Sequence, residues 1–135
     1  MAGRDVNVQM GLTSVDEVSF MMLPGKVTED VPGNIKLGFF NQIQPEVESD
    51  KIALIFGVKY ELEDDKILEC VYRFEFRVNG LDRFITTHDK DGITVTYIMP
   101  LLINVAIGTM RGILVVKTAG TNLSKYPLPI KDSAP

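Results

Sequence analysis

The sequence predicts an α+β domain in which antiparallel strands precede one long helix. Residues 52–62 and 68–78 alternate apolar and polar side chains, which is the period of strands with one buried face. Residues 101–116 are apolar on almost every side and follow Pro100, a residue that suits the first turn of a helix. A chain of 135 residues fits one domain, so we expect strands and helix to share a single core over 1–135.

Two further strands are predicted ahead of this pair. In 15–23 every second residue is apolar from Val18 onward, and a Pro-Gly pair then ends the pattern. Residues 24–34 hold two Pro-Gly pairs and are therefore expected to form a loop. Residues 1–14 are predicted to be a flexible or edge segment. The second strand, at 35–44, places three apolar side chains on one face: Ile35, Leu37 and Phe39.

The clearest signal is a long antiparallel hairpin. The acidic turn at 63–65 joins 52–62 to 68–78, and strict alternation with a short connection is typical of a hairpin. Each strand holds about a dozen residues, against about five or six in most strands. Beyond it, 79–92 carries turn signals without a clear period, and 93–97 is β-branched enough for a short strand.

The predicted helix covers 99–118, with Gly120 as its C-terminal cap. Pro127 and Pro129 forbid helix after it, so 123–130 is expected to be extended. Residues 131–135 are predicted to form a tail.

This helix lacks a continuous polar face. Between 101 and 116 only Asn104, Thr109 and Arg111 carry polar side chains. A surface helix normally shows one apolar stripe and one polar face, so one sheet covers only one side of this helix. A second copy of the same helix is the simplest cover for the other side, and glycines four residues apart permit close approach. The predicted oligomer interface, in a dimer or a tetramer, is Leu102, Val105, Gly108, Thr109, Gly112 and Val116.

Charge and cysteine content restrict the function. A net charge of −4 disfavours non-specific binding to nucleic acid, which requires clustered positive charge. The single cysteine excludes an internal disulfide, and no signal peptide is visible, so we expect a cytoplasmic protein. Arg111 lies within the most apolar stretch and would cost about 2.5–3.5 kcal/mol in a bilayer, so no membrane insertion is expected.

No group of residues predicts catalysis. Cys70 lies on the apolar face of its strand and is expected to be buried rather than paired with His88. His88 is the only histidine, so no histidine cluster can hold a metal. Residues 89–92 resemble part of a calcium loop but lack its other ligands. We therefore predict no catalytic residue, no metal and no cofactor.

The order of these segments resembles the SecB-type export chaperones. The residues that carry the resemblance are GNIKLGFF at 33–40, the hairpin at 51–78 with Leu68 and Cys70, MPLLINVAIGTMRG at 99–112, and YPLP at 126–129. Together they cover about 15–130. By this resemblance the chain is identified as SecB-like, and we expect it to be a form without the family's C-terminal helix and acidic tail, since no match to either follows the YPLP segment before Pro135.

The resemblance implies an α+β fold with a four-stranded antiparallel sheet and a long helix packed on one face. It also implies binding of unfolded, apolar polypeptide in a groove beside the sheet, for protein export or for toxin–antitoxin control. By this analogy the groove residues are Ile35, Leu37, Phe39, Pro24, Val27 and Val31.

Three hypotheses follow. The first is an ATP-independent, chaperone-like protein that binds non-native polypeptide. The second is a homo-oligomeric scaffold that buries its apolar surface against itself and has no client. The third, a small-ligand enzyme, has the least support because no acid–base group is apparent.

Overall fold

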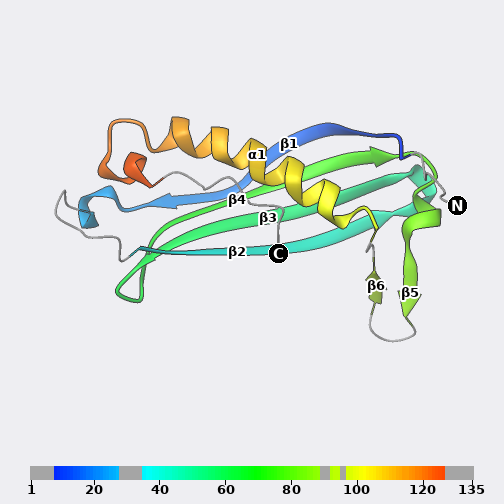
Figure 1. Cartoon of the computed structure of the whole chain (residues 1–135), viewed down its shortest axis with the longest axis horizontal. Coiled ribbons are helices and arrows are strands. Elements are labelled where there is room, and N and C mark those ends of the chain that lie inside the picture. Colours follow the sequence, from blue (N-terminus) through cyan, green and yellow to red (C-terminus); the bar gives the residue numbers. More distant parts are fainter. Residues whose placement is uncertain (1–7, 28–34, 89–91, 95–96, 127–135) are drawn as a thin grey trace, which may run out of the picture.

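A four-stranded antiparallel sheet with one long helix on one of its faces forms the protein, as the sequence predicted. The computed structural model describes residues 8–27, 35–88, 92–94 and 97–126. The sheet order is β1-β4-β3-β2, so β1 and β2 are its edges, and helix α1 runs obliquely across one face of the sheet (Figure 1). The bounds are β1 Met10–Met22, β2 Ile35–Glu46, β3 Lys51–Leu62, β4 Asp65–Val78 and α1 Met99–Lys117.

Short elements connect these segments. A small second sheet pairs β5 (Thr86–His88), which lies in the stretch without a clear period, with β6 (Gly92–Thr94), which overlaps the short strand predicted at 93–97. Four 3-10 helices are described: η1 Pro24–Lys26, η2 Val47–Ser49, η3 Leu81–Phe84 and η4 Asn122–Lys125.

The start of the predicted extended segment at 123–130 is wrong. Asn122–Lys125 form η4 because Thr121 caps it: the amide of Leu123 donates to the Thr121 hydroxyl at 3.2 Å. Residues 127–130, with the two prolines on which that prediction rested, lie outside the described residues.

The core lies between α1 and the two central strands. Alternate residues of β3 and β4 face the helix, and their apolar side chains are almost completely buried, as the strict alternation predicted. The helix contributes one stripe to this core, in which Met110 contacts the Cys70 thiol with 4.0 Å between the sulfur atoms. The core residues of these three elements include Ile52, Leu54, Phe56, Val58, Tyr60, Leu68, Cys70, Phe74, Phe76, Leu102, Ala106, Ile107, Met110 and Leu114.

Strand β1 begins earlier than predicted. It starts at Met10, opposite Val78 of β4, so 10–14 belong to an edge strand of the sheet, which is the second of the two alternatives predicted for 1–14. The register with β4 shifts at two places, between Leu12 and Ser14 and between Glu17 and Ser19. Each shift leaves an extra residue and breaks the alternation of side chains. Val18 lies at the second shift and is therefore 55% exposed.

Two groups of polar contacts hold neighbouring elements together, one at an end of the sheet and one at the C-terminal end of α1. At one end of the sheet the Asp50 carboxylate accepts hydrogen bonds from the amides of Gly80 and Leu81, both at 3.2 Å. At the C-terminal end of α1, Lys117 lies 2.7 Å from Glu17 of β1. Tyr72 of β4 donates to the same carboxylate at 2.9 Å. The helix end is thus attached to both strands beneath it.

Candidate functional site

The face of the sheet that carries α1 extends past the helix onto β2. Cα pairing places Leu37 opposite Tyr60 and Phe39 opposite Val58, so these β2 side chains share the helix-facing side of the sheet. Phe39 is 48% exposed, with its ring 5.9 Å from that of Phe56. We call the four apolar side chains of this row the β2 strip: Ile35, Leu37, Phe39 and Ile43.

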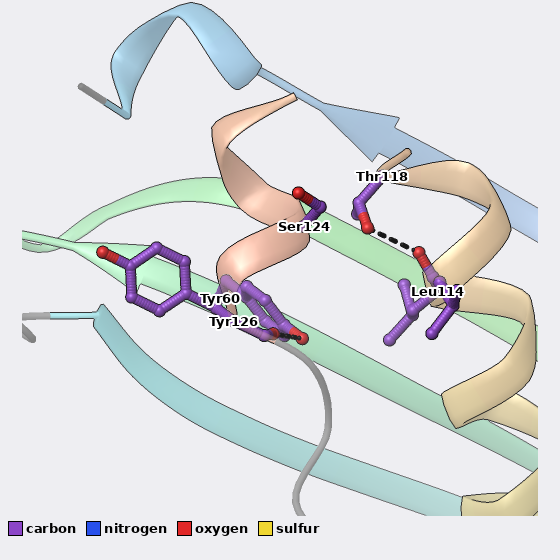
Figure 2. A pocket seen from close by; sticks show the side chains of 6 residues that line it. Tyr60, Leu114, Thr118, Ser124 and Tyr126 are labelled. Atoms are coloured by element: carbon purple, nitrogen blue, oxygen red, sulfur yellow. Dashed lines mark hydrogen bonds between the residues drawn. The ribbon is translucent and has the colours of Figure 1, made fainter. Parts of the chain in front are cut away.

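A small pocket lies where β3, the end of α1 and η4 meet (Figure 2), and its Tyr60 is paired with Leu37 of the strip. Its volume is about 50 Å³, which is room for about one or two water molecules. The lining residues are Tyr60, Leu114, Val115, Thr118, Ser124 and Tyr126.

The hydroxyl groups of Tyr60 and Thr118 in this pocket donate hydrogen bonds to backbone carbonyls of the protein itself. Tyr60 donates to the carbonyl of Tyr126 at 2.6 Å, and Thr118 donates to the carbonyl of Leu114 at 2.7 Å, as the dashed lines in Figure 2 mark. Burial raises the pKa of Tyr60 to about 12, so its hydroxyl stays protonated and remains a donor. The pocket therefore offers mainly hydrocarbon to a ligand and no group poised for acid–base chemistry.

The opposite face of the sheet carries ion pairs around an exposed phenylalanine. Phe40 points to that side, where its ring covers the backbone of Gly57: a methyl group at position 57 would lie 2.1 Å from the ring. Lys59 and Glu61 form an ion pair on the same face, at 3.7 Å, as do Lys51 and Glu75, at 3.6 Å. Phe40 is 41% exposed and is thus an apolar side chain among charges, adjacent to Phe39 in sequence but on the other face.

The outward side of α1 is a third apolar surface. Its residues Leu101, Val115 and Val116 are exposed, with Val116 at 75%. Gly108 and Gly112 lie between them, and a methyl group added at either glycine meets nothing within 4 Å. By length and composition α1 is apolar enough to cross a membrane, although its other side packs on the sheet. We call Leu101, Gly108, Gly112, Val115 and Val116 the outer stripe.

Two predicted site residues are buried inside the protomer. Leu102, predicted at the oligomer interface, is 0% exposed because it lies on the helix stripe that packs against the sheet. Val27, predicted in the groove, is 1% exposed, and its carbonyl accepts a hydrogen bond from the Asn122 side chain at 2.7 Å. Neither is available to a partner, so these two predictions are wrong.

The other predicted residues belong to the oligomer interface on α1, to the groove on β2, or to the loop between β1 and β2. Gly108, Gly112 and Val116 are exposed on the outer stripe, whereas Val105 and Thr109 are half-buried, the latter donating to the Val105 carbonyl at 2.8 Å. In the groove set, Ile35 and Leu37 are half-buried on the β2 strip and Phe39 is exposed there. Pro24 is half-buried in η1, and Val31 lies outside the described residues.

Sequence reasoning did not identify Ile43 or the pocket residues. Ile43 has the same parity as the other strip residues, but Asn41 interrupts the apolar run, so the period alone could have found it. The pocket had no local signal, because Tyr60 and Tyr126 are far apart in the chain.

The described residues hold no group of three or more histidine, cysteine, aspartate or glutamate side chains placed to bind a metal ion. Cys70 is completely buried, as predicted, and its burial raises the pKa of the thiol to about 11. A thiol in this state is a poor nucleophile.

The sequence matches no protein-family model and no curated protein. Among solved structures, the chain matches the SecB-like chaperone of Mycobacterium tuberculosis, solved in complex with a peptide from an antitoxin. The two share 9% sequence identity with a TM-score of 0.45, over 91% of this chain and 88% of the other.

Proposed function

We propose that the protein binds non-native, apolar segments of other polypeptides on the β2 strip and in the adjoining pocket, without ATP, metal or cofactor. The observation that carries this proposal is the exposure of Phe39. It lies in the middle of a strand and next to the core, yet nearly half of its surface meets solvent. Exposed apolar surface of this kind typically marks an interaction site.

The strip suits an extended polypeptide better than a compact ligand. Its first three side chains recur at every second residue of one strand, a repeat of about 7 Å, and Ile43 follows on the same face after Asn41. An extended segment carries its own side chains at the same repeat, so an apolar segment lying along β2 places one side chain near each strip residue. The pocket beside Tyr60 then accommodates the end of one small apolar side chain.

The resemblance of the sequence to SecB-type chaperones supports this activity, in protein export or in toxin–antitoxin control. We further propose that the protein acts in the cytoplasm. No catalytic activity is proposed.

A second candidate, self-association without a client, is favoured by the outer stripe of α1. Exposed glycines flanked by Leu101 and Val115 let another helix approach closely. We propose that a second copy packs there. The stripe and the β2 strip have no residue in common, so a copy packed on α1 leaves the strip accessible to a client, although Val115 belongs to both the stripe and the lining of the pocket.

The test is an aggregation assay with a denatured client protein. Phe39→Asp places a charge on the strip, and we expect it to abolish the delay of aggregation that the wild-type protein causes. Leu37→Asp should have the same effect. The matched control is Phe40→Asp, which changes a neighbouring phenylalanine of similar exposure on the other face of the sheet. It should retain activity.

Two results would contradict the proposal. One is a wild-type protein that fails to delay aggregation at stoichiometric excess. The other is equal loss from Phe39→Asp and Phe40→Asp with both variants folded, which would show that the strip has no special role. Circular dichroism and thermal melting of each variant establish that it is folded.

A further inference from the structure

The two edges of the sheet are protected differently. The register of β1 with β4 shifts twice, whereas β2 pairs with β3 over its whole length without a shift. Among the described residues β2 has no strand on its other side. An edge strand presents a row of unpaired amide and carbonyl groups, and bulges are one of the usual devices that prevent another strand from adding. The β2 edge lacks that device and is a regular template for a strand.

Two unused charges lie near the two ends of this edge. Lys36 is across from Glu61 of β3, and Glu46 is across from Lys51. These β3 residues are engaged elsewhere, Glu61 with Lys59 and Lys51 with Glu75. In the part of the chain that the structure describes, no ion pair involves Lys36 or Glu46.

We propose that β2 is the interface at which a second copy of this chain adds its own β2, antiparallel, about a two-fold axis at Asn41. In this register Lys36 faces Glu46 of the partner subunit, and symmetry repeats the pair at the other end. Phe39 faces Ile43 of the partner subunit on the helix side. A charge pattern that complements itself under a two-fold rotation identifies a second copy as the occupant, because symmetric dimers require self-complementary surfaces.

Other registers lose these features. A shift by a single residue places helix-facing side chains opposite outward-facing ones. A shift of two residues in the pairing removes the contact between Lys36 and the partner's Glu46, and a parallel pairing brings like charges together. Pro45, which has no amide proton, lies next to the end of β2 and removes at most one donor from each end of the ladder.

The pairing joins the two sheets into one, with both α1 helices on the same side. It uses the backbone edge of β2 and leaves the helix-facing side chains in place, so the β2 strips of the two copies become neighbours. The inference goes beyond the proposed function and does not rest on it. A dimer can form at this edge whether or not the protein binds clients.

The first test exchanges charges and measures assembly mass by sedimentation velocity. Lys36→Glu alone and Glu46→Lys alone each place two like-charged pairs across the axis, and we expect each variant to show half of the wild-type mass. A 1:1 mixture of the two variants restores both attractive pairs, and it should recover the wild-type mass. The control Asp16→Lys makes the same size of charge change on the β1 edge and should have no effect.

The second test reads the register by disulfide formation under mild oxidation. Cα atoms of directly opposed residues lie about 4.5–5.5 Å apart, within the range that a disulfide spans. Asn41→Cys should therefore cross-link two copies completely. Gln44→Cys should not, because it lies about 20 Å from its own symmetry mate in this register. The native Cys70 is buried and does not compete.

The proposal is overturned if the wild-type protein is a monomer at micromolar concentration, or if the two charge variants keep the wild-type mass. It is also overturned if their mixture fails to recover that mass, or if Gln44→Cys cross-links as readily as Asn41→Cys. An effect of Asp16→Lys alone would move the interface to β1. Loss of client binding by Phe39→Asp, with assembly unchanged, bears only on the proposed function.

Discussion

Replacing Gly112 of α1 by alanine distinguishes a free outer stripe from one that is packed against a second helix. Within the protomer the added methyl group meets nothing within 4 Å. Alanine is favoured over glycine in a helix by about 1 kcal/mol, so a free stripe would gain that stability. For a domain of this size the gain corresponds to a rise in melting temperature of about 3–5 °C.

A packed stripe gives the opposite sign. If the glycines allow two helices to approach closely, the methyl group falls inside the contact, and overpacking typically costs about 1–3 kcal/mol for each copy. In a two-fold contact both copies carry the change, so the assembly loses roughly 2–6 kcal/mol while each protomer gains about 1 kcal/mol. Because we propose a packed stripe, we predict that Gly112→Ala weakens assembly even though it favours the helix.

The assay combines sedimentation at several protein concentrations with thermal melting at the same concentrations. We expect Gly112→Ala to dissociate at concentrations at which the wild-type protein stays assembled. The control is Gly11→Ala on β1, where a methyl group also meets nothing within 4 Å but no helix contact is proposed. If Gly112→Ala raises the melting temperature at every concentration and leaves the mass unchanged, the outer stripe is free surface and our reasoning is wrong.

Three further predictions concern single groups. The Cys70 thiol should react with a thiol reagent only after unfolding, because burial raises its pKa to about 11; fast labelling of the native protein would contradict the structure. The hydrogen bond from Lys117, and to a lesser extent that from Tyr72, lowers the pKa of Glu17 below its ordinary value of 4.5. The stability that Glu17 contributes is therefore fully present above pH 4.5 and is lost as the pH falls through the pKa of Glu17 in the folded protein. Glu17→Gln should therefore lower the urea midpoint at neutral pH, and this effect should shrink as the pH falls through the folded-state pKa of Glu17; an effect that stays constant on acidification would contradict this. Asp50→Ala removes two hydrogen bonds to backbone amides at a residue with φ of 54°, and denaturant titration should show a loss of about 2–4 kcal/mol; Asp50→Asn, which keeps an acceptor, should lose less.

The parts of the fold that follow from local pattern could be predicted from the sequence. The β3–β4 hairpin is an example, because both strands lie inside the sheet and every second side chain must enter the core. Strand β1 shows where this fails. Its two register shifts put Val18 outside and break the period, so the first residues of the strand, from Met10, were not recognised.

The helix shows a second limit. Its ends were predicted almost correctly, but Leu102 was assigned to the wrong side. A helix that is apolar all round has no polar stripe to fix its rotation, so sequence alone does not say which apolar stripe meets the sheet. In the structure the stripe of Leu102 and Met110 faces the core, whereas that of Leu101 and Val115 faces outward.

One part of the candidate site could likewise be predicted from a local pattern, and the other part could not. Three residues of the β2 strip alternate along one strand, so their shared face was predicted from the period, and the resemblance assigned that face to the groove. The pocket beside Tyr60 requires a strand, a helix end and a 3-10 helix that are distant in sequence, and no local pattern reports their meeting.

The ring of Phe40 resting on bare backbone at Gly57 has an evolutionary consequence. The space above position 57 is occupied, so any larger residue there expels the aromatic ring toward water. Among descendants of this sequence, the two sites should mutate as a pair: glycine persists where the phenylalanine is kept, and becomes replaceable once a small side chain stands at position 40.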